Sequence, residues 1–122
     1  MTETVHIIDP NADHRAGFAA ALAGEPVSVQ SYESAHEFLN QSSATSSGCV
    51  IASADLPSPG TRALIEEIRR RGLPLAVIVV GEASDLSVAV DFMRAGAADF
   101  LEQPVSDWRL QQAVRQAIGL DT

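Results

Sequence analysis

Short apolar runs alternate with helix-like segments along this chain, and this alternation limits the possible folds more than any other feature. The runs are rich in β-branched residues and lie at 5–8, 27–29, 49–51, 75–80 and 98–101. The first, third and fourth runs lack the polar alternation of half-exposed strands, which indicates strands that are buried on both faces. The five strand–helix repeats predict an α/β fold. We expect a doubly wound, five-stranded parallel sheet in the order 2-1-3-4-5, with helices on both faces.

Each run is followed by apolar residues three or four positions apart, which is the spacing of an amphipathic helix. In the fourth helical segment, this apolar set consists of Val88, Val90, Phe92 and Met93. Residues that could cap helix starts with a side-chain oxygen are Asn11 or Asp13, Ser34, Ser84 and Ser106. Glycines at the expected helix ends are Gly24, Gly72, Gly96 and Gly119.

Length and charge exclude several classes of protein. The 122 residues contain no linker, and we expect one domain spanning 1–122. Sixteen acidic and eight basic side chains give a net charge of −8, which argues against direct nucleic-acid binding by this segment. No apolar stretch approaches the ~20 residues of a membrane span, and no signal peptide is visible. With one cysteine and no possible internal disulfide, we expect a cytoplasmic location.

Three histidines and the cysteine have ordinary structural interpretations. His6 lies in the first strand and is expected to pack there, while His14 and His36 lie on helices and are expected to be exposed. Cys49 reads as a small buried apolar residue of the third strand. These residues lack the spacing of a zinc site.

Ligands of open α/β sheets bind beyond the carboxyl ends of the strands, so the residues at those ends decide the chemistry. The sequence has Asp9-Pro10, 53–55, Gly81-Glu82 and 102–104 at these positions. They contain no glycine-rich nucleotide loop and no serine hydrolase motif. We therefore expect a domain that is not an enzyme.

Several stretches of the sequence resemble the receiver domain of response regulators in two-component signalling, closest to FixJ/NarL-like transcription factors. They lie at 5–9, 31–35, 37–39, 48–51, 56–57 and 95–102, the last shortly before Pro104. The resemblance runs from about Thr4 to Ile118. It implies the flavodoxin-like (CheY-like) fold and a regulatory, protein-interaction role in a phosphorelay that controls a transcription-factor output.

The resemblance also assigns the functional positions of a receiver, where this chain departs from the pattern. Asp9 and Pro10 stand at the metal-binding acidic pair, Ser53 at the phosphoacceptor aspartate, Gly81 at the hydroxyl and Gln103 at the lysine. We call these five residues the vestigial phosphorylation pocket. A neutral alcohol without Mg²⁺ and lysine is a poor phosphoryl acceptor. We therefore expect a pseudo-receiver with no catalytic residue, no phosphorylation by a histidine kinase, and weak or lost Mg²⁺ binding.

Two alternatives remain open. A two-residue shift would make Asp55 the acceptor of a working phosphorelay receiver, with Mg²⁺ held at Asp9. In the favoured alignment, with Ser53 at the acceptor position, Asp9 and Asp55 together could bind a cation weakly. The second alternative is a small-ligand sensor. Its ligand would occupy the space that Gly81 and Ser53 leave where phosphate binds in relatives.

Two residues near the fifth strand have roles implied by the resemblance. Phe100 matches the switch aromatic, whose ring moves inward on phosphorylation in relatives, but its hydroxyl partner is replaced by Gly81. We expect packing alone to decide the direction of the Phe100 ring. The Gln103–Pro104 peptide bond is expected to be cis, as in relatives.

The fourth helix, fifth strand and fifth helix form the face through which relatives dimerise. The residues expected to contact a protein partner or a second copy there are Asp91, Arg94, Asp99, Trp108 and Arg109. Trp108 is the only tryptophan of the chain, and it reads either as a half-buried cap on its helix or as an interface anchor.

Overall fold

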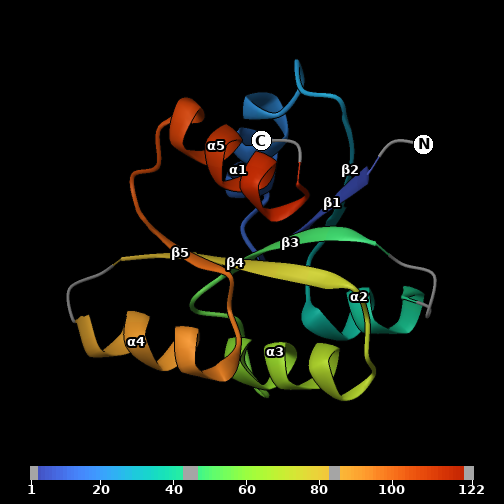
Figure 1. Cartoon of the computed structure of the whole chain (residues 1–122), viewed down its shortest axis with the longest axis vertical. Helices are drawn as coiled ribbons and strands as arrows, with labels where there is room; N and C mark the ends of the chain where they lie inside the picture. The colour runs from blue at the N-terminus through green and yellow to red at the C-terminus, as the bar shows by residue number, and fades with distance from the viewer. Residues whose placement is uncertain (1–2, 43–46, 83–85, 120–122) are drawn as a thin grey trace.

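The computed structural model describes residues 3–42, 47–82 and 86–119 (Figure 1). The strands are β1 (Glu3–Ile8), β2 (Val27–Tyr32), β3 (Gly48–Ser53), β4 (Leu75–Gly81) and β5 (Asp99–Glu102). The helices are α1 (Ala12–Ala21), α2 (Ala35–Gln41), α3 (Thr61–Arg70), α4 (Leu86–Ala95) and α5 (Asp107–Ala117). The described strands form a parallel sheet in the order β2-β1-β3-β4-β5, and the predicted fold is confirmed.

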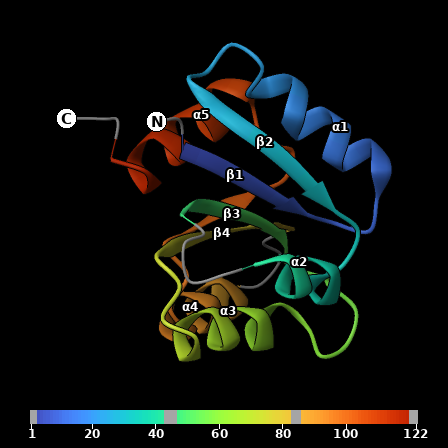
Figure 2. The ribbon, with the colours of Figure 1, turned by 90° about the vertical axis from the view of Figure 1, so that its right-hand side faces the viewer.

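Helices cover both faces of the sheet (Figures 1 and 2). Helices α1 and α5 lie on one face, while α2, α3 and α4 lie on the other. Neighbouring residues of β1 contribute to opposite cores, with Ile7 in the cluster under α1 and α5 and Ile8 in the cluster with α2 and α3. Both side chains are fully buried, and each such burial contributes about 1.5–3 kcal/mol to folding. Two cores of this kind explain why the central strands are apolar on both faces.

Side-chain caps begin three of the helices, as predicted. The Asn11 side chain accepts hydrogen bonds from the backbone N–H groups of Asp13 and His14, so Asn11 and not Asp13 caps α1. Ser34 caps α2 and Ser106 caps α5 in the same way. The fourth predicted cap, Ser84, lies outside the described residues.

Three of the four glycines predicted at helix ends have the left-handed backbone that ends a helix. The φ angles are 66° at Gly72, 120° at Gly96 and 76° at Gly119, whereas Gly24 is not in this region. Helix α1 instead ends at Ala21, and Leu22 is its C-cap, with no left-handed residue.

Two arginines at the end of α3 connect this helix to its neighbours. Arg69 Nη1 donates to the carbonyl of Ala95 at 2.8 Å, and Arg71 Nη1 donates to the carbonyl of Leu39 at 2.9 Å. Ala95 is the last residue of α4, and Leu39 lies in the last turn of α2. Because helix carbonyls at this end lack partners within the helix, guanidinium groups stabilise them well.

Three further expectations can be compared with the structure. The Gln103–Pro104 peptide bond is cis, as predicted, and the Ser58–Pro59 bond is cis as well. His6 and Cys49 are buried, while His14 and His36 are exposed, as predicted. Among the residues that the structure describes, no helix is long and apolar enough to cross a membrane.

The buried thiol of Cys49 is expected to be unreactive in the folded protein. Burial, with the nearby Glu3 carboxylate as a smaller cause, raises the pKa of this thiol to about 12. Since the thiolate is the reactive form, an aromatic disulfide reagent at pH 8 should label native Cys49 far more slowly than the unfolded chain. A Ser28→Cys variant, with its new thiol on the exposed side of β2, provides the reactive control. Equal labelling rates at both positions would contradict this expectation.

Candidate functional site

The strands of a parallel sheet all end at the same edge, and this brings the predicted pocket residues together. Ile8 pairs with Ala52 in the register of the sheet, Ser53 with Val80, and Gly81 with Glu102. Asp9, Ser53, Gly81 and Gln103 therefore follow or end four neighbouring strands. The Gln103 backbone N–H donates to the Gly81 carbonyl at 2.9 Å, which extends the pairing of β5 beyond its last residue.

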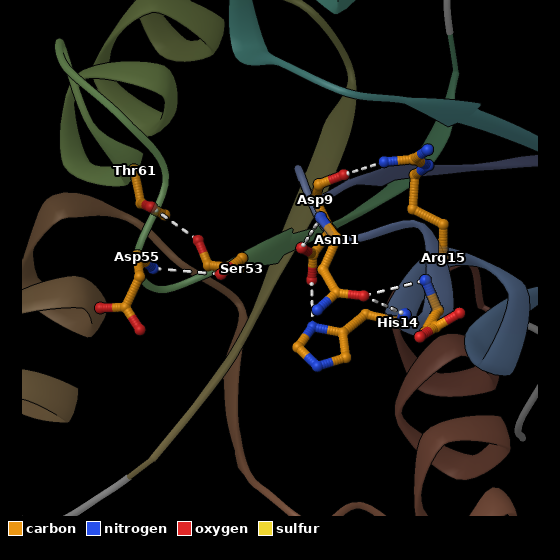
Figure 3. A network of polar contacts seen from close by, with 8 residues as sticks. Asp9, Asn11, His14, Arg15, Ser53, Asp55 and Thr61 are labelled. Atoms are coloured by element: carbon orange, nitrogen blue, oxygen red, sulfur yellow. Dashed lines mark hydrogen bonds and ion pairs between the residues drawn. The ribbon is translucent and has the colours of Figure 1, made fainter.

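The Asp9 carboxylate already has partners within the chain (Figure 3). Asp9 is only 4% exposed. Its Oδ1 accepts a hydrogen bond from the Asn11 N–H at 2.8 Å, and its Oδ2 lies 3.1 Å from His14 Nδ1. Arg15 Nη1 donates to the Asp9 backbone carbonyl at 2.6 Å. The N-cap and the first turn of α1 thus provide the polar partners that a buried carboxylate requires.

Sequence reasoning missed the contact between Asp9 and His14. The signal was available, because the Asn11 cap starts α1 directly after β1 and leaves His14 in the first helical turn. A side chain in that turn can reach back to the end of the preceding strand. Pro10, the second residue of the acidic-pair position, is exposed and offers no side-chain ligand.

Ser53 lies at the start of a turn that is stabilised by hydrogen bonds among its own residues and Thr61 (Figure 3). Its Oγ accepts a hydrogen bond from the Asp55 N–H at 3.2 Å. The hydroxyl of Thr61, the first residue of α3, donates to the Ser53 carbonyl at 2.6 Å and accepts from the Leu56 N–H at 3.3 Å. Thr61 is buried and was not singled out from the sequence. These bonds connect the end of β3 to the start of α3 and fix the shape of the turn between them.

Asp55 and Asp9 do not form a joint cation site in this structure. Asp55 is exposed, and Figure 3 shows its carboxylate pointing away from Asp9. The described residues contain no group of three or more His, Cys, Asp or Glu side chains that could hold a metal ion. Mg²⁺ prefers several oxygen ligands in octahedral geometry. One carboxylate, already engaged by His14 and Asn11, does not fit that ion.

The space beside Gly81 is filled by its neighbours. A Cβ atom added to Gly81 would lie 2.5 Å from the Ala54 Cβ and 3.7 Å from the Phe100 Cζ. The tip of the Phe100 ring therefore points toward Gly81, and the ring stacks on Phe92 with 6.2 Å between centroids. A hydroxyl-bearing side chain at position 81 would collide with Ala54 in this arrangement. Ala54 and Phe100 thus occupy the room next to the missing side chain.

Gln103 lies apart from these contacts. It is partly buried and lines a hollow of about 270 Å³ between α1 and the start of α5, together with His14, Phe18 and Leu110. His14 thus both contacts the Asp9 carboxylate and lines this hollow.

The residues predicted for the partner face divide into two groups. Asp91 and Arg94 are exposed on α4, and Asp99 of β5 pairs with Arg109 of α5 at 3.2 Å.

Trp108 is 68% exposed, so it is not a half-buried cap. It shares a stripe of α5 with Gln111 and Arg115, which bind the Ala21 carbonyl and the Glu25 carboxylate near the end of α1. Trp108 thus lies on the side of α5 that faces the end of α1.

Helix α4 has two apolar stripes, one facing the core and one facing outward, which the spacing of apolar residues in the sequence did not separate. Phe92 packs toward the core beside the buried Ala95. Leu86, Val90 and Met93 follow one another at the spacing of a single outward face and are 78%, 38% and 45% exposed. Counting apolar residues cannot tell which of two stripes faces the core. The exposed stripe lies next to Arg94 and extends the partner face.

Comparisons with known proteins agree with this geometry. The family model described as the response regulator receiver domain matches residues 5–115. The transcriptional regulatory protein FixJ of Azorhizobium caulinodans is 35% identical over 115 residues, which cover 94% of this chain and 54% of that protein. This chain spans about half the length of the curated relatives that it matches.

Solved structures give the same result. A response regulator receiver protein from Pseudoalteromonas atlantica is 31% identical with a TM-score of 0.85, covering 98% of this chain and 99% of that one. Full-length FixJ from B. japonicum is 28% identical with a TM-score of 0.87, covering 98% of this chain and 59% of that one.

The Gly81–Ala54 contact predicts a coupled pair of substitutions. Gly81→Ala should lower the free energy of unfolding by about 1–3 kcal/mol, because the new methyl group overpacks the site. Combining it with Ala54→Gly should recover part of the loss, and urea unfolding of both single variants and the double variant measures the coupling. Gly17→Ala is the control, since nothing lies within 4 Å of its added Cβ on α1. That control should stabilise the protein by about 0.5–1 kcal/mol. Strictly additive effects at positions 54 and 81 would contradict the steric explanation.

Proposed function

Because the chain belongs to the family of response regulator receiver domains, we propose that it is a degenerate receiver in two-component signalling. It acts through contacts with proteins, and it does not accept a phosphoryl group from a histidine kinase. The observation that carries this proposal is the serine at the end of β3, where the family has its acceptor aspartate.

The environment of Ser53 supports this proposal. A hydroxyl needs a general base to become a nucleophile. Among the residues that the structure describes, the hydrogen-bond partner of the Ser53 Oγ is the Asp55 backbone N–H, which is not a base. The developing charge of a phosphoryl transfer also needs a cation beside it. The Asp9 carboxylate faces His14, and glutamine replaces the lysine at position 103. No step of phosphoryl transfer is supported by these side chains.

The wider biological role follows by analogy with the relatives. FixJ of Azorhizobium caulinodans is a transcriptional regulatory protein about twice as long as the matched region. We propose that this domain likewise controls a transcription-factor output and works in the cytoplasm. Its protein contacts would replace phosphorylation as the means of control.

The partner face supports a second copy of this chain as one binding partner. Leu86, Val90 and Met93 form an exposed apolar stripe on α4, and exposed apolar residues that are contiguous commonly mark interaction sites. Asp91 and Arg94 lie together along one side of the stripe with opposite charges, which lets two copies pair in a symmetric arrangement. The Asp99–Arg109 pair within the chain leaves these two residues less available to a partner.

The two alternative functions have less support. For a working receiver, Asp55 would have to turn toward Asp9, and the Asp9 carboxylate would have to leave His14. For a ligand sensor at the vestigial phosphorylation pocket, Ala54 and Phe100 would have to leave the space beside Gly81. Each alternative requires a rearrangement of contacts that are satisfied in this structure.

Treatment with acetyl phosphate and Mg²⁺ is expected to produce no covalent adduct. Intact mass spectrometry at neutral pH checks this directly. Amide NMR spectra in the presence of beryllofluoride and Mg²⁺ should likewise show no shift around Ser53. An adduct that is lost in an Asp55→Asn variant would instead establish the working phosphorelay receiver. An active relative, tested in parallel, controls for the reagents.

Self-association through α4 should depend on the exposed apolar stripe. We expect a weak dimer in sedimentation velocity experiments at high concentration and a monomer for Met93→Glu, since a buried unpaired charge opposes the interface. Ser28→Glu on β2, at the opposite edge of the sheet, is the charge-matched control and should still dimerise. A wild-type protein that remains monomeric, or an equal loss in both variants, would rule out this interface.

A further inference from the structure

A groove with a volume of about 470 Å³ lies between α2 and α3, which are neighbours on one face of the sheet (Figures 1 and 2). The residues that line it lie on α2, on α3 and its C-cap, or in the turn that leads into α3. None of them belongs to the vestigial phosphorylation pocket or to the partner face. This groove is therefore a separate surface that the proposed function does not use.

The helical period brings the two walls of the groove together. Ala63, Glu67 and Arg71 follow one another four positions apart and form one stripe along α3. His36 and Asn40 have the same spacing on α2. The hydrogen bond from Arg71 Nη1 to the Leu39 carbonyl, 2.9 Å long, joins the two walls at the carboxyl ends of both helices.

The floor of the groove is apolar and deep. Ala35 is 7% and Leu64 1% exposed, and Leu39 packs against the core cluster to which both belong. A flat protein surface would not reach such a buried floor, whereas a small molecule between the helices would contact it. The volume falls within the ~300–1,000 Å³ of small-ligand sites, which are mostly apolar with a few polar groups.

The polar end of the groove has a net positive charge. The Glu67 carboxylate accepts hydrogen bonds from Arg70 and from Arg71 Nε, the latter at 3.1 Å. The Arg70 bond, followed by that of Arg71, lowers the pKa of Glu67, so this group is ionised at neutral pH. Two guanidinium groups and one carboxylate leave one positive charge. A protein with a net charge of −8 thus presents a local cation beside an apolar floor.

Arg71 has donors to spare for a ligand. Its Nε donates to Glu67 and its Nη1 to the Leu39 carbonyl, while its Nη2 has no hydrogen-bond partner among the residues that the structure describes. A guanidinium group has five N–H donors in a planar fork, and a carboxylate is the anion that fits this fork best. The side chain is 35% exposed, so a ligand can reach it without breaking its present bonds.

We propose that this groove binds a small monocarboxylate with an apolar body. The carboxylate would accept hydrogen bonds from Arg71, and the apolar body would lie on the floor formed by Ala35, Leu39 and Leu64. The bound molecule would contact the arginine that connects α3 to α2. Binding would require neither phosphorylation nor Mg²⁺.

Three probes separate the two features of this proposal. Hydrocinnamate carries the charge and the apolar ring, hydrocinnamamide lacks the charge, and propionate lacks the ring. Amide NMR titration of the 122-residue chain at pH 7 should give saturable shifts with hydrocinnamate at residues 35–40 and 63–71. We expect a dissociation constant on the order of 1 mM for a ligand of this size. The other two probes should bind about tenfold more weakly or not at all, because each loses one of the two interactions.

Variants on α3 test the same assignment. Arg71→Gln removes the charge and should weaken hydrocinnamate binding about tenfold. Arg62→Gln is the matched control, since Arg62 is exposed on the same helix, pairs with Glu66 and does not line the groove. Ala63→Leu should fill the groove and block the binding of hydrocinnamate.

Three results would overturn the proposal. The first is the absence of saturable shifts at the residues of the groove. The second is equal binding of hydrocinnamate and its uncharged amide, or an equal effect of the Arg71 and Arg62 substitutions. The third is binding that maps to another surface, such as the exposed stripe of α4. The titration of the unmodified protein with the three probes decides the question even if a variant fails to fold.

Discussion

The burial of one parallel sheet on both faces is the constraint on which the rest of this structure depends. A strand in the middle of such a sheet must be apolar on both sides, because helices cover each face, and β1, β3 and β4 satisfy this requirement. The strands also run in one direction, so their carboxyl ends meet at one edge and bring Asp9, Ser53 and Gly81 together from distant parts of the chain. The location of the candidate site follows from the hydrophobic pattern alone, while its chemistry depends on the few residues that stand at that edge.

The features that sequence reasoning predicted correctly are those that local chemistry determines. The sheet order follows from the alternation of runs and helices, and the caps at Asn11, Ser34 and Ser106 follow from the hydrogen bonds that a short polar side chain can accept. The residues that went unnoticed act through tertiary distances. The contact of His14 with Asp9 and that of Thr61 with Ser53 depend on where a helix begins relative to a strand end, within an ångström or two. The outward direction of Val90 and Met93 depends on which of two apolar stripes the sheet selects.

The two ends of β1 present opposite polar environments. At its carboxyl end, each oxygen of the Asp9 carboxylate has a partner from the N-cap or the first turn of α1, so the chain itself satisfies this buried group. Toward its amino end, His6 keeps a buried nitrogen without a donor among the described residues. The polar groups at the carboxyl end of β1 therefore have partners within the chain itself.

The two arginines at the end of α3 have a mechanical consequence for the helices on their face of the sheet. Arg69 holds the last carbonyl of α4, and Arg71 holds a carbonyl in the last turn of α2, so the amino acids of one short segment clamp the same end of three helices. A displacement of α4 by a partner at its exposed apolar stripe would therefore be transmitted to α3 and α2, because the arginine hydrogen bonds oppose separation of the helix ends. We expect these three helices to move together, with smaller displacements at their connected carboxyl-terminal ends than at their amino-terminal ends.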